Sequence, residues 1–345
     1  MPFNPVVIVA KTRPEWYGPT AAYTRPDMRR STLQLVGTFV PYAALLALMV
    51  YTVLEGLPYW LTLLLALAAV PLYIRIFIFF HDCTHGSFLA TPRWNRNLGY
   101  LCGLLTFTPF HDWRRSHAGH HLSAGDLDRR GYGDITLLTV AEYDAAPRMQ
   151  RLGYWLYRNP LVMFGIGPAF YFLLRNRWPS KGAKRMDRLS VLYVNLAIAG
   201  ILGLAWLTIG IRTYLLVQLP VVLLAGPVGV WLFYIQHQFQ GVYWARTAEW
   251  DPWRVVMEGA VYYQLPRALH WMTGNIGFHH VHHMRPAIPN YNLERCYLET
   301  PQLQEAKPLT LAASLHALRL NLYDEATRTM VSFKQARQAR KAAGG

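Results

Sequence analysis

Residues 273–283 read Thr-Gly-Asn-Ile-Gly-Phe-His-His-Val-His-His, which places four imidazoles within five consecutive positions. On a helix, where each residue advances by about 100°, His279, His282 and His283 share one face, and His280 lies at its edge. Imidazoles packed this tightly have no use in an apolar core, whereas neutral imidazole is the commonest side-chain metal ligand. We therefore expect this stretch to bind metal and the rest of the chain to bring further histidines to it.

Two earlier stretches repeat the pattern. Residues 81–85 read His-Asp-Cys-Thr-His, so the two histidines lie one helical turn apart on the same face. Residues 116–121 read Ser-His-Ala-Gly-His-His and have the same i, i+3, i+4 spacing as the last cluster. A further histidine closes the last long apolar run, where it could bind metal or simply interact with the helix dipole. The nine candidate metal ligands are His81, His85, His117, His120, His121, His237, His279, His282 and His283.

The composition indicates a membrane protein. Of the 345 residues, 53% are hydrophobic and only 15% are charged, whereas soluble domains carry about 25% charged residues. Four apolar runs are long enough to cross a bilayer as helices. These expected spans cover residues 35–54, 57–80, 189–211 and 213–237. Two shorter runs, residues 98–110 and 160–174, are expected to lie at the membrane interface.

These patterns predict an all-α, multi-pass membrane protein with a single domain over residues 35–295. Its four transmembrane helices would carry a helical cap, formed by residues 81–188 and 238–295, that holds the histidines. An N-terminal segment, residues 1–34, and a C-terminal tail, residues 296–345, would flank this domain. The basic, alanine-rich end of the tail, residues 325–345, is expected to form a surface helix.

Basic residues outnumber acidic residues by 34 to 19 and gather outside the two short turns between the spans. The positive-inside rule therefore places both termini and all three histidine clusters on the cytoplasmic side. The same charge could also serve an acidic protein partner, which we expect to dock around Arg114, Arg115, Arg129 and Arg130. Nucleic-acid binding is not expected, because no basic helix or aromatic-basic platform stands out. Three scattered cysteines likewise give no disulfide framework.

The number of histidines indicates two metal ions. Structural zinc takes four ligands and catalytic zinc takes three plus water, so nine imidazoles suit two ions with four or five each. Imidazole binds zinc, copper, iron and nickel, so ligand type alone leaves the metal open. A site beneath apolar helices suggests an apolar substrate that arrives from the lipid. Because oxidation of an unactivated C–H bond requires a redox metal and dioxygen, two iron ions are favoured.

The three histidine clusters closely resemble the histidine boxes of the integral-membrane fatty-acid desaturases in order, spacing and placement relative to the spans. The surrounding residues 80–88, 231–239 and 274–283 are similar to the acyl-lipid branch, which includes delta-12 (omega-6) and some bacterial delta-5 enzymes. The resemblance extends from about residue 30 to residue 295. The first box has three intervening residues where the acyl-CoA delta-9 branch usually has four, and His279 stands where front-end desaturases have glutamine.

The resemblance implies a di-iron enzyme that inserts a cis double bond into an acyl chain, using dioxygen and two electrons. The box histidines and His237 would bind iron, and Asn275 would hold an iron-bound water. No His-Pro-Gly-Gly heme motif is present, so electrons would come from a separate protein of the ferredoxin or cytochrome b5 type. Asp82, Asp112 and Asp134 are expected either to orient ring N–H groups or to form ordinary salt bridges or caps.

Two alternatives remain open at this point. A histidine-rich di-iron hydroxylase or ketolase that acts on alkanes or carotenoids would need nearly the same ligands. A membrane metal transporter would instead place its ligands near the middle of the bilayer, between broken helices. The histidines of this chain fall at and beyond the ends of the apolar runs, which argues against a transporter.

Overall fold

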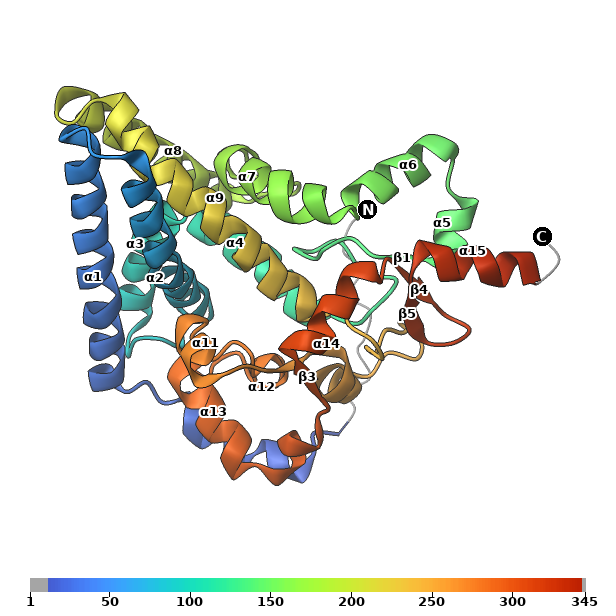
Figure 1. Cartoon of the computed structure of the whole chain (residues 1–345). Helices are drawn as coiled ribbons and strands as arrows, with labels where there is room; N and C mark the ends of the chain where they lie inside the picture. The colour runs from blue at the N-terminus through green and yellow to red at the C-terminus, as the bar shows by residue number, and fades with distance from the viewer. Residues whose placement is uncertain (1–11, 343–345) are drawn as a thin grey trace.

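The computed structural model describes residues 12–342, and most of this range is helical (Figure 1). The first eleven residues of the predicted N-terminal segment and the last three of the tail lie outside the described residues. The α-helices of six or more residues are α1 (Met28–Leu54), α2 (Tyr59–His85), α3 (Pro92–Leu105), α4 (Phe110–Ser123), α5 (Val140–Ala145), α6 (Arg148–Tyr157), α8 (Arg185–Leu207), α9 (Ile211–Ile235), α11 (Arg267–Met272), α12 (His279–Met284), α13 (Asn290–Glu299), α14 (Leu311–His316) and α15 (Phe333–Ala342). Shorter or non-α helical segments are η1 (Glu15–Tyr17), η2 (Pro19–Thr24), η3 (Val162–Ile166), α7 (Gly167–Ala169), η4 (Phe170–Leu174), η5 (Arg175–Arg177), α10 (Pro252–Arg254), η6 (Val255–Gly259), η7 (Pro301–Glu305) and η8 (Ala317–Arg319).

Four helices of the described chain, α1, α2, α8 and α9, are long and apolar enough to cross a membrane, as predicted. Their ends differ from the expected spans because capping side chains and glycines, rather than the apolar runs, set them. Asp27 accepts hydrogen bonds from the backbone of Arg29 and Arg30, so α1 begins before its apolar run. Helix α2 continues through the first histidine box and ends where Gly86 adopts a left-handed conformation, with φ of 71°.

Helix α2 lies at the centre of this bundle. In its most apolar window 61% of the residues are buried, against 17% in α1 and 22% in α8, so α1 and α8 are the helices that face outward. Arg75 interrupts the apolar sequence of α2. Its side chain is buried, and it donates hydrogen bonds to Thr38 Oγ1 at 3.0 Å and to the carbonyl of Trp271. Arg75 therefore faces the protein interior and ties α2 to α1 and α11.

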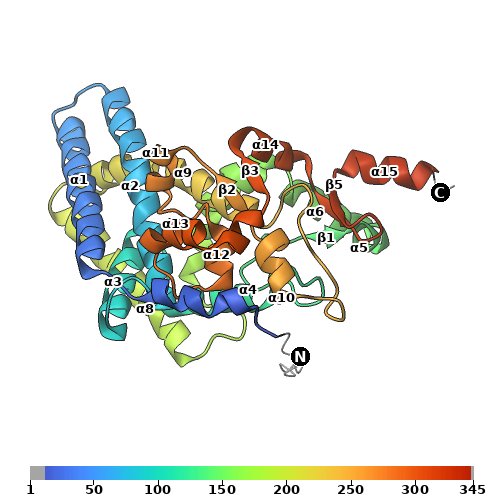
Figure 2. The same cartoon turned by 90° about the horizontal axis from the view of Figure 1, so that it is seen from below.

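The histidine-bearing ends of α2 and α9 lie at the same end of the bundle. The turns that join α1 to α2 and α8 to α9 lie together at the opposite end (Figure 1). Most of the remaining elements form a cap around the histidine-bearing end. Seen from below, α4, α12 and α13 gather there, and α15 projects to the side away from α1 (Figure 2).

The two shorter apolar runs do not form membrane-length helices. Residues 98–110 are divided between α3, a turn and the start of α4. Residues 160–174 form the consecutive segments η3, α7 and η4, of which η3 and α7 pack against α9. Both runs therefore stay short, as expected, and the second one covers a side of the bundle.

The chain is mostly helical, as predicted, and five short strands also occur within residues 12–342. They are β1 (Leu138–Thr139), β2 (Tyr262–Gln264), β3 (Pro308–Thr310), β4 (Leu322–Asp324) and β5 (Thr329–Val331). Strand β4 pairs in parallel with β1 and antiparallel with β5, and β2 pairs in parallel with β3. Strands of two or three residues carry too little periodicity to be seen in sequence. They attach residues beyond 295 to the cap. Of the predicted terminal surface helix, residues 325–345, the part that the structure describes is helical over Phe333–Ala342.

Candidate metal centre

All nine predicted ligand histidines come together around the ends of four helices. His81 and His85 occupy the last turns of α2, His237 follows the end of α9, and the others lie on α4 and α12. They form two groups in which one ligand atom from each residue lies within 4.8 Å of the others. The first histidine group contains His81, His85, His117, His121 and His282, and the second contains His120, His237, His279 and His283. This division matches the expected two ions with four or five imidazoles each.

The two groups cut across the histidine boxes. Helix α4 gives its i, i+4 pair, His117 and His121, to the first group, and His120 to the second. Helix α12 does the reverse, giving His279 and His283 to the second group and His282 to the first. Residues four apart on a helix differ by about 40° in direction, whereas a residue three positions on points about 60° the other way. Each helix therefore reaches both groups and fixes them side by side.

Several ring nitrogens within each group point at one another. In the first group His121 Nε2 lies 3.2 Å from His117 Nε2 and 3.0 Å from His282 Nε2. In the second, His237 Nε2 lies 3.0 Å from both His283 Nε2 and His279 Nε2. Nε2 of a neutral imidazole carries at most one hydrogen, so neither His121 nor His237 can donate a hydrogen bond in both of its contacts. Two nitrogens bound at right angles about 2.1 Å from one ion lie about 3.0 Å apart, so these contacts fit a shared cation.

Unpartnered nitrogens support the same conclusion. Nε2 of His85 in the first group and Nε2 of His120 in the second are buried without a hydrogen-bond partner among the described residues. A buried polar atom without a partner is costly unless something absent from the protein chain satisfies it. Both groups therefore fit metal ions by their donor type and by their unsatisfied lone pairs.

Burial keeps these imidazoles neutral, which is the form that binds metal. Desolvation lowers the pKa of His117, His121, His279, His282 and His283 well below the ordinary value for histidine, and neighbouring imidazoles lower it further. Desolvation likewise lowers the pKa of His237 to about 3. The lone pairs of these rings are therefore free for coordination at neutral pH.

Hydrogen bonds on the far side of three rings set their direction. Asp82 Oδ1 lies 3.1 Å from His81 Nδ1, Asp134 contacts Nδ1 of His120, and the carbonyl of Gly259 lies 2.8 Å from Nδ1 of His237. Such partners fix the tautomer and aim Nε2 at the metal. The expectation that acids orient ring N–H groups thus agrees with these contacts for Asp82 and Asp134.

For Asp112 the contacts match the other alternative, a salt bridge or cap. Its carboxylate accepts hydrogen bonds from the backbone and hydroxyl of Ser180 and lies 3.5 Å from Arg115, so it joins α4 to the segment before α8. Asp82 has a second contact that the sequence did not suggest. Its Oδ2 accepts hydrogen bonds from the backbone and side-chain amides of the buried residue Asn290, at 2.8 and 2.9 Å.

Two residues next to the third box lie outside both groups. Nε2 of His280 lies 3.2 Å from the carbonyl of Leu303, away from the other imidazoles, as its edge position indicated. Asn275 has a left-handed backbone, with φ of 57°, and its side chain donates to the carbonyl of Asn290 at 3.2 Å. Its expected contact with a metal-bound water therefore stays a prediction.

An apolar cavity of about 330 Å³ leads to the histidines. Its walls come from α2, α9 and the η3–η4 segment, with Phe77, Val222 and Gly229 among the lining residues. At its polar end it touches His81 and His117 of the first group and His279 of the second. Trp113, which the sequence analysis missed, lines the cavity and stacks on His117 with a ring-centroid distance of 4.3 Å. The i, i+4 spacing of these two residues on α4 was the available signal.

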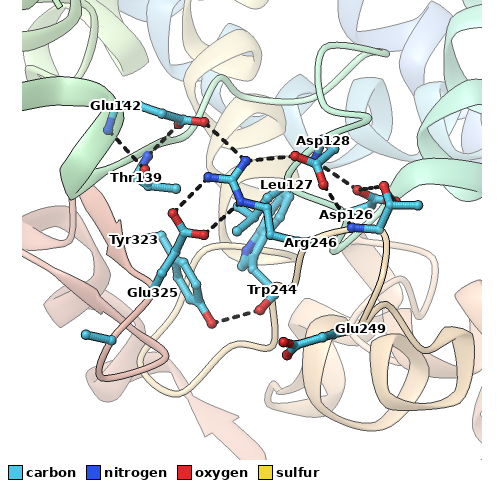
Figure 3. Close-up of polar contacts among 12 residues, drawn as sticks. Asp126, Leu127, Asp128, Thr139, Glu142, Trp244, Arg246, Glu249, Tyr323 and Glu325 are labelled. Atoms are coloured by element: carbon cyan, nitrogen blue, oxygen red, sulfur yellow. Dashed lines mark hydrogen bonds and ion pairs between the residues drawn. The ribbon is translucent and has the colours of Figure 1, made fainter. Parts of the chain in front are cut away.

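Residues near the C-terminus form hydrogen bonds with the segment that follows His237. Tyr323 Oη donates to the carbonyl of Trp244 at 2.9 Å, and the Trp244 indole N–H donates to the carbonyl of His237 at 3.3 Å. Beside them, Arg246 holds Glu325 through two contacts of 2.8 Å and Asp128 through a third (Figure 3). Three distant parts of the chain are therefore joined beside the second histidine group.

Three of the four arginines at the predicted docking surface form ion pairs within the protein. Arg115 pairs with Asp187 at 2.7 Å, Arg129 with Asp126 at 2.5 Å and Arg130 with Glu142 at 2.5 Å. These three guanidinium groups join parts of the cap, and docking of an acidic partner around them stays a prediction. Arg114 is exposed, in agreement with the expectation.

Comparison with known proteins decides the family. The family model described as fatty acid desaturase matches residues 55–312, which include all nine histidines. This chain belongs to the fatty acid desaturase family. Members of this family are oxygen-dependent oxidoreductases, so this desaturase is an enzyme of that class. The assignment supports a desaturase over the hydroxylase, ketolase and transporter alternatives.

Individual relatives agree with the family match. A fatty acid desaturase from Bacillus subtilis is 44% identical over 314 residues, covering 91% of this desaturase and 89% of the relative. An sn-1 oleoyl-lipid 12-desaturase from Synechocystis is 29% identical over 231 residues, covering 63% and 62%. An sn-1 acyl-lipid omega-3 desaturase (ferredoxin) from Nostoc is 27% identical over 267 residues, covering 71% and 69%.

Proposed function

We propose that this desaturase inserts a cis double bond into the acyl chain of a membrane lipid at a pair of iron ions held by the nine histidines. The reaction removes two hydrogens from adjacent methylenes and consumes dioxygen, two electrons and two protons. It yields the alkene and two waters. The lipid substrate class is supported by the Synechocystis and Nostoc relatives, whose names specify oleoyl-lipid and acyl-lipid substrates.

The observation that carries this proposal is the shape of the cavity. Its walls are apolar, and it touches imidazoles of both histidine groups, at His81, His117 and His279. An extended hydrocarbon chain in this cavity would therefore lie against both candidate metal positions. Because α2 and α9 form the walls and also lead into His81 and His237, the depth of the chain is fixed relative to the metals. This fixed depth selects the carbons that react.

The metal is proposed to be iron because an unactivated C–H bond must be oxidised, and zinc has no redox chemistry. Bound iron would supply the oxidising power for hydrogen removal. The chain holds the ligand rings in place through Asp82, Asp134 and the carbonyl of Gly259. The aromatic walls, including Phe77 and Trp113, exclude water from the reacting methylenes.

Electrons are proposed to come from a separate donor protein, either a ferredoxin or a cytochrome b5 type protein. The Nostoc relative, whose name specifies ferredoxin, supports the first possibility. We also propose that the cap and both termini face the cytoplasm, with residues 35–295 as the catalytic domain. Basic residues gather before α1 and between η4 and α8, whereas the turn between α1 and α2 carries Glu55 and neither Lys nor Arg.

The experiment is expression of the full chain in a host with a known lipid profile, followed by mass spectrometry of the fatty acids with double-bond mapping. We expect a new cis double bond that is absent when His121 is replaced by alanine. An oxygenated hydrocarbon without any new double bond would contradict a desaturase. Metal analysis of the purified protein should give two irons per chain, and one zinc without iron would contradict the proposed redox mechanism.

A further inference from the structure

A second cavity lies between α6 and α15, away from the histidines. It has a volume of about 200 Å³ and is lined by three arginines together with aromatic and aliphatic side chains. We call it the arginine pocket. Its lining residues are Tyr143, Arg151, Trp155, Leu322, Phe333, Ala336, Arg337 and Arg340.

One side of the basic terminal helix α15 lines the pocket. Phe333, Ala336, Arg337 and Arg340 follow helical spacing and form one stripe of α15, and all four line the pocket. From the opposite side, Arg151 of α6 lines the same space. Two arginines of α15, both partly exposed to water, therefore lie across the cavity from a third.

The protein balances only part of the positive charge around the pocket. Arg340 pairs with Asp144 at 2.9 Å, whereas Arg151 and Arg337 have no ion pair among the described residues. Three guanidinium groups around one small cavity repel each other, and an anion between them would relieve this repulsion. Guanidinium is also the side-chain group best matched to phosphate oxygens, because it offers paired donors in a plane.

The position of the pocket indicates where such an anion comes from. The side of α6 that faces away from the protein is apolar, with Met149 75% exposed and Leu152 and Leu156 also exposed. The η3–η4 segment continues this surface, with Leu161 80% exposed. Figure 1 shows α6 and α7 extending sideways from α9, with α15 below α6. An amphipathic helix of this kind lies in the membrane interface, where lipid phosphates are found.

We propose that the arginine pocket binds the phosphate group of an anionic phospholipid. The apolar surface of α6 lies among the acyl chains, and Arg151, Arg337 and Arg340 hold the head group from the aqueous side. Because the pocket shares no residue with either histidine group, this site can exist whether or not the proposed reaction is correct.

The test uses the full-length protein in detergent and measures its thermal unfolding with added short-chain lipid. Dioctanoyl-phosphatidylglycerol, which is anionic, should raise Tm of the natural protein by about 3 °C. The zwitterionic dioctanoyl-phosphatidylcholine should raise it much less. In the double variant Arg151→Gln/Arg337→Gln the shift with phosphatidylglycerol should disappear.

Matched variants separate this site from general charge effects. Lys334→Gln/Lys341→Gln also removes two positive charges, both from positions on α15 that do not line the pocket. This variant should keep the full shift in Tm. Arg151→Lys/Arg337→Lys should keep part of it. An unchanged shift in the arginine-to-glutamine variant would overturn the proposal. So would an equal shift from inorganic phosphate alone with no further gain from the lipid, because the ligand would then be free phosphate.

Discussion

His120 and His121 are consecutive on α4, yet their imidazoles belong to different histidine groups. Consecutive residues on a helix point about 100° apart, so one helix can give a ligand to each of two adjacent groups. The same holds for His282 and His283 on α12. The two candidate metal positions therefore share two helices, and removing one ligand should affect one position first.

Single substitutions should separate the two positions. His121→Ala should remove metal mainly from the first group and His120→Ala mainly from the second, each lowering bound metal from two ions per chain towards one. Activity should fall by at least ~100-fold in both variants, because neither group can act alone. Metal analysis and product analysis check this. His316→Ala is the control, because this exposed histidine belongs to neither group, and it should retain both ions.

The aspartate beside His120 should matter for metal affinity. Asp134→Asn leaves the size of the side chain unchanged but weakens its hold on Nδ1 of His120, so affinity at the second group should fall by about 10–100-fold. Competition with a chelator measures this loss. Asp112→Asn is the matched control, since that carboxylate contacts Ser180 and no histidine of either group. Equal losses in both variants would show that Asp134 has no special role.

The cavity should limit the length of the acyl chain. A Cβ added at Gly229 meets nothing within 4 Å, and this glycine lines the cavity, so Gly229→Leu should fill the space without disturbing the helix. Desaturation of long acyl chains should fall by roughly 10-fold or more, and shorter chains should be affected less. Gas chromatography of products from mixed substrates measures the ratio. Gly200→Leu on the exposed side of α8 should leave the ratio unchanged.

The contact between Glu325 and Arg246 should depend on pH. The hydrogen bond from Arg246 lowers the pKa of Glu325 below its ordinary value of 4.5. A carboxylate whose pKa is lowered by folding stabilises the folded state above that ordinary value, and the stabilisation is lost as the pH falls through the lowered pKa. Hydrogen exchange of residues 322–331 should therefore quicken, relative to its intrinsic rate, as the pH drops below about 4.5. Glu325→Gln should show fast exchange already at neutral pH and a weaker pH dependence.

Much of this protein could be predicted from the sequence because the signals are local. Apolar runs of about 20 residues must become helices in lipid, since no other backbone structure satisfies its own hydrogen bonds there. The spacing of histidines within each box places them on one helical face whatever surrounds the helix. The four long helices, the nine histidines that converge and the family resemblance all follow from such local patterns.

Tertiary structure alone decided how those histidines are divided. Whether His120 joins His121 or His237 depends on the angles at which α4, α9 and α12 meet, and sequence spacing does not contain those angles. Contacts between distant residues likewise decided that Asp134 serves a histidine while Asp112 serves Ser180, and that Arg115, Arg129 and Arg130 are occupied by acids. A helix fixes the direction of its own side chains, but only packing against other helices determines what those side chains meet.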